Sequence, residues 1–361
     1  MASKFKFRRA SAVFAALAVI SGLTVAGCGP KADAPSGEGS ARGAAVKLGG
    51  RIGLRIAMIA KSSTNPVFVS AHEGARAAAR ELSAAEGVSV TVEILTPGTE
   101  DAQRQAQAIA EAVNNGFDAI LISCSDAAKV TSAINEAVDR GVAVMTFDSD
   151  APDSRRFAFY GADDIAVGTQ VMQELGQLIP ADLNGTFHIA ILAGNQNAPN
   201  LQKRVKGVLD EAARNPRVRI VGTFYHNETA QDATAEVLRA MPANPEIDGW
   251  AMVGGWPLFA PGLLREIDPA RTKIVAVDAL PAQLAYVDQG VVPVLLAQPT
   301  YLWGKVGVET IFRKVVRGES VETVTKMNLI RVDRSNLGEW AAQLKDWGFD
   351  GIDPKLLSRQ P

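Results

Sequence analysis

Hydrophobic residues fall into short apolar runs that alternate with longer amphipathic segments from residue 55 onward. Nearly continuous apolar runs are typical of strands that are buried on both faces of a sheet. Residues 142–150, Val-Ala-Val-Met-Thr-Phe-Asp-Ser-Asp, show this most clearly, because the apolar run stops abruptly at Asp148 and Asp150. Ligands of open α/β sheets lie beyond the carboxyl ends of the strands, so this strand end is a candidate site.

The alternation predicts strands separated by helices along most of the chain. Strands are expected at residues 55–60, 88–95, 119–123, 142–147 and 157–161, and then at 187–192, 218–224, 249–253, 273–277, 292–297 and 323–330. Helices are expected at 66–86, 101–114, 127–140, 165–178, 201–215, 232–241, 281–289 and 303–317, with a short one ending at 267. This βα alternation favours an α/β fold with parallel sheets. There are too many strands for one compact sheet, so we expect two Rossmann-like, doubly wound lobes with a cleft between them.

The first residues have the pattern of an export signal. A positively charged start (residues 4–9) precedes an apolar run (13–20), which ends in small residues before Cys28. This ending resembles the lipobox of bacterial lipoproteins, so we expect residues 1–27 to be removed and Cys28 to be lipidated. Residues 28–51 are rich in Gly, Ala, Ser, Pro and Lys and predict a flexible tether. The expected location is the periplasm or the cell surface, with the lipid on Cys28 anchoring the protein to a membrane.

Composition narrows the function further. The formal charge is −2, with 47% hydrophobic and 21% charged residues, as in an ordinary globular protein. No basic stripe is present, so nucleic acid is not an expected partner. With Cys28 lipidated, Cys124 has no partner for a disulfide. The three histidines are widely separated in the sequence, which argues against a metal site.

Polar side chains or close-approach glycines follow almost every predicted strand. In the first series these include Asn65, Ser123, Asp148 and Asp150, and in the second series Asn200, Gly254, Trp256, Asp278 and Gln298. Lys61 and His226 are the potentially basic groups among the strand ends. Carboxylates and amides with nearby aromatic rings, including Phe68, suit a neutral polyhydroxy ligand. A phosphate or nucleotide ligand would require more Arg or Lys side chains or a glycine-rich helix start. No cofactor is expected.

At these residues the chain resembles the periplasmic sugar-binding proteins of ABC importers, of the ribose-binding type. The matching segments are Ile56-Ala-Met-Ile59 with Asn65-Pro-Val-Phe68, Ile120-Leu-Ile-Ser123-Cys-Ser-Asp126, Val144-Met-Thr-Phe-Asp148, Arg204-Val-Lys-Gly207, Ile274-Val-Ala-Val-Asp278, and Leu296-Ala-Gln298 followed by Gly304. The resemblance extends from about residue 55 to residue 330. Their order and spacing carry the resemblance, since no single segment is specific.

The resemblance implies a type I periplasmic binding protein fold with three crossings between the lobes. The first lobe would comprise residues 52–161 plus 299–330, and the second 162–298 plus 331–361, which also includes the C-terminal tail. The lobes would close on a sugar by hinge bending, and a permease would recognise the closed form. The implied ligand contacts are Asn65, Phe68, Ser123, Asp148, Gln202, Arg204, Asp278 and Gln298.

The chain departs from the ribose-binding pattern at three places. Ser149 and Gln202 stand where that pattern has arginine, and residues 254–256 replace an Asn-Asp pair. These departures argue against ribose as the ligand. The prediction is therefore a monomeric, lipid-anchored protein that delivers a neutral monosaccharide or sugar alcohol to an ABC importer and performs no chemistry.

Two other functions fit parts of the pattern. Asp148 and Asp150 resemble the Asp-x-Asp start of magnesium-dependent phosphotransferases, although Pro152 stands where that motif has Thr or Val. A sensing lipoprotein that reports to a chemoreceptor or sensor kinase would use the same closed form as a transport protein. A DNA-binding repressor is excluded, because no helix-turn-helix precedes Arg55 and the export signal removes the protein from DNA.

Overall fold

The computed structural model describes residues 53–358 of the chain. The predicted signal segment 1–27, the tether 28–51 and the lipidation site Cys28 lie outside the described residues. The described part contains two six-stranded sheets, each with its own packed helices. No helix in this part is long and apolar enough to cross a membrane.

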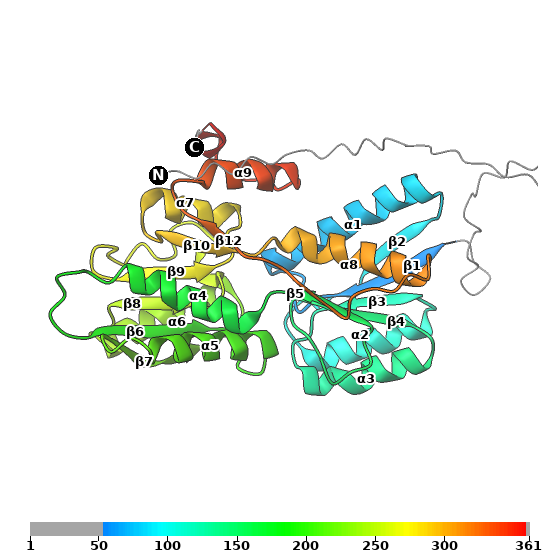
Figure 1. Ribbon diagram of the computed structural model, residues 1–361, viewed down its shortest axis with the longest axis horizontal. Helices are drawn as coiled ribbons and strands as arrows, with labels where there is room; N and C mark the ends of the chain where they lie inside the picture. Colours follow the sequence, from blue (N-terminus) through cyan, green and yellow to red (C-terminus); the bar gives the residue numbers. More distant parts are fainter. Residues whose placement is uncertain (1–52, 359–361) are drawn as a thin grey trace, which may run out of the picture. The chain divides into compact units, whose positions relative to one another are not determined.

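The first sheet is entirely parallel, with the strand order β11-β5-β4-β3-β1-β2. Its strands are β1 (Leu54–Ile59), β2 (Val90–Ile94), β3 (Ala119–Ile122), β4 (Ala143–Phe147), β5 (Ala158–Gly161) and β11 (Val324–Lys326). Helices α1 (Pro66–Glu86) and α8 (Thr300–Val315) pack together on one side of it, and α2 (Ala102–Asn114) and α3 (Ala127–Asp139) on the other (Figure 1). This sheet and its helices are the first lobe below.

The second sheet has the equivalent strand order β12-β10-β9-β8-β6-β7 and is parallel except for the β10–β12 pair. Its strands are β6 (Phe187–Ala193), β7 (Val218–Tyr225), β8 (Gly249–Met252), β9 (Lys273–Val277), β10 (Val294–Ala297) and β12 (Ile330–Val332). Its helices are α4 (Asp164–Gln177), α5 (Pro199–Ala212), α6 (Ala230–Ala243), α7 (Pro281–Gln289), α9 (Leu337–Asp346) and α10 (Pro354–Leu357). This sheet and its helices are the second lobe. The predicted α/β class with two parallel-sheet lobes is confirmed.

The chain passes between the two sheets at three places: after β5, after β10 and between β11 and β12. The third passage corrects the sequence prediction of a single strand at 323–330. Met327 donates its N–H to the carbonyl of Gly161 in the first sheet, and β12 then pairs with β10 in the second. The apolar pattern could not show that one extended segment would divide between two sheets.

Two other predictions of local structure were wrong or incomplete. The short helix expected before residue 267 is a 3₁₀ turn at Trp256–Leu258 followed by bends and turns. The C-terminal helices α9 and α10 were not predicted. Because α9 buries Leu337, Trp340 and Leu344, it contributes to the core rather than forming a loose tail.

Close helix packing in the second lobe depends on small residues. A Cβ atom added at Gly168 on α4 would lie 1.9 Å from the carbonyl oxygen of Arg204 on α5, so only glycine allows this approach. On α5 itself, a Cβ at Gly207 would lie 2.2 Å from the carbonyl oxygen of Ile165. The two helices therefore touch backbone to backbone, which fixes the position of Arg204.

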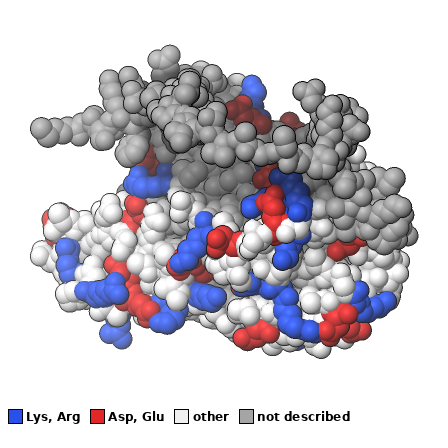
Figure 2. All heavy atoms as spheres, turned by 45° about the vertical axis from the view of Figure 1, so that its right-hand side comes forward, with Lys and Arg blue, Asp and Glu red and all other residues white. Residues whose placement is uncertain are grey.

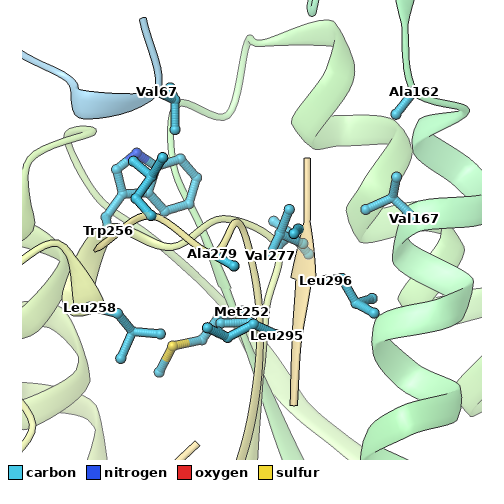
Figure 3. Packing of buried hydrophobic residues seen from close by; sticks show 14 of the residues in the cluster. Val67, Ala162, Val167, Met252, Trp256, Leu258, Val277, Ala279, Leu295 and Leu296 are labelled. Atoms are coloured by element: carbon cyan, nitrogen blue, oxygen red, sulfur yellow. The ribbon is translucent and has the colours of Figure 1, made fainter. Parts of the chain in front are cut away.

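The apolar core fills the space between the sheets and their helices. All four residues of β3, β8 and β10 are buried, as expected for central parallel strands. Figure 3 shows part of this packing, with Met252, Leu295 and Val277 on neighbouring strands. On the described face visible in Figure 2, Lys and Arg side chains lie interspersed with Asp and Glu. The charged surface there carries no large patch of one sign.

Candidate functional site

The carboxyl ends of strands from both sheets meet at a cavity. It contains about 320 Å³ of space free of protein atoms, part of it open to solvent. The part of it that the centre of a water-sized sphere can reach is about 30 Å³, well below the roughly 300–1,000 Å³ of typical ligand pockets, so side chains fill most of the space between the strand ends. The lining residues are Lys61, Asn65, Val67, Phe68, Asp148, Asn200, Arg204, Glu228, Gly254, Trp256, Phe259, Asp278, Gln298 and Trp303.

Two carboxylates occupy equivalent positions in the two lobes. Asp148 follows β4 and has a φ of 55°, and Asp278 follows β9 and has a φ of 71°. Among the residues that the structure describes, these two are the non-glycine residues with a left-handed backbone. Asp adopts this conformation more readily than most residues. Each N–H donates to the neighbouring strand, at 3.0 Å to the Tyr160 carbonyl and at 2.9 Å to the Leu296 carbonyl. The turn thus directs each strand end into the cavity.

Asp148 is held by side chains from both lobes. Its Oδ2 accepts a hydrogen bond from Ser123 Oγ at 2.8 Å, and its Oδ1 accepts one from Asn200 Nδ2 at 3.2 Å. Arg204 Nη2 lies 4.0 Å from the same Oδ1. Because only 4% of Asp148 is exposed, these contacts replace most of its hydration.

Arg204 reaches the cavity through a network of hydrogen bonds. Its guanidinium donates to Asp164 Oδ1 at 2.9 Å, to the Val253 carbonyl at 3.1 Å and to Gln298 Oε1 at 2.9 Å. Burial alone would lower the pKa of Arg204, but the carboxylates of Asp164, Asp148 and Asp278 raise it above its ordinary value. Burial raises the pKa of Asp164 to about 6 despite the lowering effect of Arg204. Arg204 is therefore a fixed, charged donor.

Gln298 connects this network to the second carboxylate. Its Nε2 donates to Asp278 Oδ1 at 2.8 Å, while its Oε1 accepts from Arg204. Burial raises the pKa of Asp278, and Arg204 and the Gln298 hydrogen bond offset part of that effect. Gln298 comes immediately after β10, where the chain returns to the first lobe, so the site is directly linked to a crossing segment.

Apolar and aromatic side chains cover other walls of the cavity. Figure 3 shows Val67 from the start of α1 beside the indole of Trp256 from the second lobe. Gly254 makes room for this indole, since an added Cβ would lie 2.3 Å from its ring. Phe68 and Trp303 form a second aromatic group, with ring centroids 6.1 Å apart. Trp303 Nε1 is buried and has no hydrogen-bond partner among the described residues.

Lys61 and Glu228 enter the cavity from opposite lobes. Lys61 Nζ donates to Asn200 Oδ1 at 3.2 Å and lies 3.9 Å from Glu228 Oε1. Burial is the largest influence on Lys61 and lowers its pKa, but the carboxylates of Glu228, Glu100 and Asp148 together raise it. The lysine is thus charged although only 2% of it is exposed.

Comparison with protein families decides the identity of this two-lobed architecture. Residues 56–320 match the family described as periplasmic binding protein domain. The chain belongs to this family. Members of this family are binding proteins. The expectation that the chain is not an enzyme is therefore confirmed.

Solved structures show the same periplasmic binding protein fold. A carbohydrate transporter solute-binding protein from Agrobacterium radiobacter, in complex with D-arabinose, has a TM-score of 0.73 and 23% identity, covering 81% of this chain and 98% of that chain. An ABC transporter solute-binding protein from Burkholderia graminis, also with D-arabinose, has a TM-score of 0.69 and 23% identity, covering 78% and 96%. The Caulobacter myo-inositol-binding protein has a TM-score of 0.70 and 20% identity, covering 79% and 95%.

Nine of the sequence-predicted ligand residues line the cavity of this binding protein. They are Asn65, Phe68, Asp148, Asn200, Arg204, Gly254, Trp256, Asp278 and Gln298. Asn65 also caps α1, since its Oδ1 accepts from the Val67 N–H at 3.2 Å. Asn200 is not the N-cap of α5, because Ala198 holds that position.

Three predicted residues are not among those that line the cavity. Ser123 lies behind Asp148 and positions its carboxylate. Asp150 is held by Arg156, at 2.5 Å to Nε and 2.6 Å to Nη2, and also accepts from Thr146. Gln202 is exposed and donates to the Gln196 carbonyl at 2.8 Å. The proposed site below therefore omits Asp150 and Gln202.

The two acids of the proposed phosphotransferase motif, Asp148 and Asp150, do not act together in the structure. Asp148 faces Ser123, Asn200 and Arg204, whereas Asp150 forms a separate ion pair with Arg156. Among the described residues there is no group of three or more His, Cys, Asp or Glu that could hold a metal ion. Together with the family assignment, this overturns the phosphotransferase alternative.

Proposed function

We propose that this protein binds a neutral monosaccharide or sugar alcohol in the cavity between its lobes and delivers it to an ABC importer. The observation that carries the proposal is the pairing of Asp148 and Asp278 at equivalent strand ends, each fixed by amide side chains. Ionised carboxylates only accept hydrogen bonds, so two fixed carboxylates in one small cavity call for a ligand with several donors. Sugar hydroxyls provide such donors.

The other walls of the cavity fit the same class of ligand. Phe68, Trp256 and Trp303 offer aromatic faces for the C–H surface of a sugar ring. The unpartnered Trp303 N–H is a donor for a hydroxyl or ring oxygen, because buried donors in native proteins are nearly always satisfied. Complexes of similar structures with D-arabinose and with myo-inositol agree with a sugar or polyol ligand.

The charges in the cavity argue against anionic ligands such as sugar phosphates. Three carboxylates, Asp148, Glu228 and Asp278, line the cavity against two cations, Lys61 and Arg204. Both cations are already engaged, Lys61 with Asn200 and Glu228, and Arg204 with Asp164 and Gln298. A phosphate group would meet more negative than free positive charge.

The wider architecture supports capture by lobe closure. We propose that residues 52–161 plus 299–330 and residues 162–298 plus 331–361 move as two lobes about the three crossing segments. The protein would act as a monomer of the ribose-binding type, anchored by a lipid on Cys28 in the periplasm or at the cell surface. Its partner would be the permease of an ABC importer, which would recognise the closed form.

A thermal-shift screen tests the proposal. The chain from residue 28, with Cys28→Ser to prevent lipidation, is heated with pentoses, hexoses, inositols and linear polyols, and separately with sugar phosphates and Mg²⁺. A ligand at about one hundred times its Kd adds roughly 2.7 kcal/mol to the free energy of unfolding and raises the midpoint by several degrees. A selective shift with one neutral sugar supports the proposal. A response confined to phosphate esters or Mg²⁺ contradicts it.

A further inference from the structure

A pair of glutamates from opposite lobes lies beside the ligand cavity. Glu100 stands between β2 and α2 in the first lobe, and Glu228 between β7 and α6 in the second. Both line a groove next to the ligand cavity, and Glu228 lines the cavity as well. We refer to Glu100 and Glu228 as the interlobe acid pair.

The two carboxyl groups are in direct contact across the lobes. Glu100 and Glu228 lie close enough for a hydrogen bond to form between them when one of the two carboxyl groups is protonated. Asn195 connects them further, because its Nδ2 donates to Glu100 Oε1 at 3.1 Å and its backbone N–H to Glu228 Oε1 at 3.3 Å. Only 7% of the Glu228 side chain is exposed. Each of these contacts with Glu100 exists only when the lobes are together.

Few groups compensate the charge of the pair. Lys61 faces it from the first lobe, 3.9 Å from Glu228, and its ammonium also interacts with Asp148 and Arg204 deeper in the cavity. His226 and Asp232 line the same groove on the second lobe. One lysine cannot neutralise two half-buried carboxylates that lie close together, and a hydrogen bond between two carboxyl groups needs a proton on one of them.

The titration of Glu100 agrees with this geometry. Burial is the largest cause and, together with Glu228, raises the pKa of Glu100 from 4.5 to about 8. Lys61 and the Asn195 hydrogen bond lower it only in part. With the lobes apart, Glu100 would lose both Glu228 and its burial and would titrate near the ordinary value for glutamate.

We propose that closing the lobes takes up one proton at the interlobe acid pair, so that the closed form is favoured in acid and opens as the pH rises. This inference rests on the proposed function only in assuming that the lobes move relative to one another. It adds a regulator to that motion, because an acidic surrounding would favour the closed form.

The direction and size of the pH effect on closure follow from the number of protons that each form binds. The closed form binds more protons than the open form between the pKa of the open state and that of the closed state, so the closing constant falls as the pH rises in that interval. One proton gives at most a tenfold change per pH unit, and we expect a fall of about tenfold or more between pH 6 and pH 8.

Double electron–electron resonance, which measures distances between pairs of spin labels, tests the pH dependence of closure directly on ligand-free protein. Spin labels are placed at Gln103→Cys on α2 and Gln231→Cys on α6, both exposed and close in sequence to the two glutamates, in the chain from residue 28 with Cys28→Ser. We expect the short-distance population of the otherwise wild-type chain to decline from pH 6 to pH 8. Glu100→Gln, a neutral mimic of the protonated acid, should keep that population at both pH values, and Glu228→Gln should do the same.

A matched control separates the pair from general charge effects. Glu111→Gln on the exposed face of α2 removes a carboxylate from the same lobe, and this variant should follow the wild-type pH dependence. A pH-independent distance in the wild-type chain, or an unchanged pH dependence in Glu100→Gln, overturns the inference. Because no sugar is used, a failed sugar screen contradicts the proposed function and leaves this result standing.

Discussion

At the scale of single residues, the left-handed backbone of Asp148 and Asp278 fixes where the two carboxylates point. A residue at positive φ turns the chain sharply, so the side chain projects past the strand end instead of alternating across the sheet. Such conformations cost free energy and persist where surrounding contacts hold them. Here the ladder bonds to Tyr160 and Leu296 and the amides of Asn200 and Gln298 provide those contacts.

Replacing Asp148 should damage binding more than folding. We expect Asp148→Ala to weaken binding of the sugar found in the thermal-shift screen by about 2 kcal/mol or more, because the hydroxyls it accepts from would be buried without partners. This corresponds to roughly a thirtyfold higher Kd by titration calorimetry. Asp153→Ala, which removes an exposed carboxylate from the same lobe, should leave the Kd unchanged. An unchanged Kd in Asp148→Ala would remove this residue from the site.

The sequence indicated most cavity residues because they follow strand ends. It could not show which of two adjacent polar residues would face the cavity. Asp148 and Asp150 look alike in the sequence, and only the turn at Asp148 and the Arg156 ion pair separate them. On α5, by contrast, the helical period separates the residues that face the cavity from those that do not. Asn200 and Arg204 are four residues apart and share a face, whereas Gln202 lies on the opposite side.

Lys61 and Glu228 show where local pattern gives no information. Lys61 was recognised in the sequence as a basic group at a strand end, but nothing near it predicts that it binds Asn200 in the other lobe. Glu228 lies in a polar loop and looks like a solvated acid. Their burial results from the approach of two loops that are far apart in the sequence.

At the scale of elements, the contact between α4 and α5 determines where Arg204 lies in the wall of the cavity. The helices were predicted from their amphipathic pattern, but the backbone contact at Gly168 and Gly207 was not. This contact places Arg204 where it can reach Asp164, Val253 and Gln298 together. The shape of the cavity wall in the second lobe therefore depends on residues that do not line the cavity.

Enlarging this contact should affect both stability and binding. Gly168→Ala would place a methyl group 1.9 Å from the Arg204 carbonyl and push the helices apart. We expect a loss of about 1–3 kcal/mol in the free energy of unfolding, as in other overpacked cores, together with a higher Kd as Arg204 shifts.

The same helix supplies the control for this substitution. An added Cβ at Gly176 on α4 meets nothing within 4 Å, so Gly176→Ala should leave the Kd unchanged. It should also stabilise the helix, by up to about 1 kcal/mol. Thermal unfolding and calorimetry on both variants check the pair. Equal effects of the two substitutions would show that the α4–α5 contact does not position Arg204.

At the scale of the whole described chain, the C-terminal segment connects the two lobes. Trp340 on α9 donates its Nε1–H to the Ala279 carbonyl of the second lobe at 2.7 Å. Trp347 then stacks on Tyr301 at the start of α8, in the first lobe, with ring centroids 5.4 Å apart and planes 5° from parallel. Tyr301 lies just after the crossing from β10 to α8, so this stack is beside one of the three crossing segments.

Removing the stack should loosen the coupling between the lobes. We expect Trp347→Ala to lower the free energy of unfolding by about 1–3 kcal/mol. It should also broaden the distribution of distances between spin labels at positions 103 and 231. Trp347→Phe, which retains an aromatic face for Tyr301, should preserve most of the wild-type behaviour. A distance distribution unaffected by Trp347→Ala would mean that the segment stabilises one lobe without restraining the motion.

The alternation of strands and helices was enough to predict the two-lobed fold, because parallel sheets buried on both faces leave a strong apolar pattern. The C-terminal helices were missed for a different reason. Leu337, Trp340 and Leu344 lie beyond the segment that carried the family resemblance, which ended at residue 330. The division of 323–330 between two sheets depends on tertiary pairing that no local pattern encodes.

The matching positions of Asp148 and Asp278 have a consequence for how such a site can arise. Strand β4 holds the same place in its sheet as β9, and each aspartate bonds to the next strand of its own sheet, β5 or β10. One lobe thus carries half of a site, complete with its turned carboxylate. Two copies of a single ancestral lobe, facing each other as a symmetric dimer, would already have enclosed a ligand between two such aspartates. Fusion of such copies into one chain would then leave each half free to acquire different neighbours.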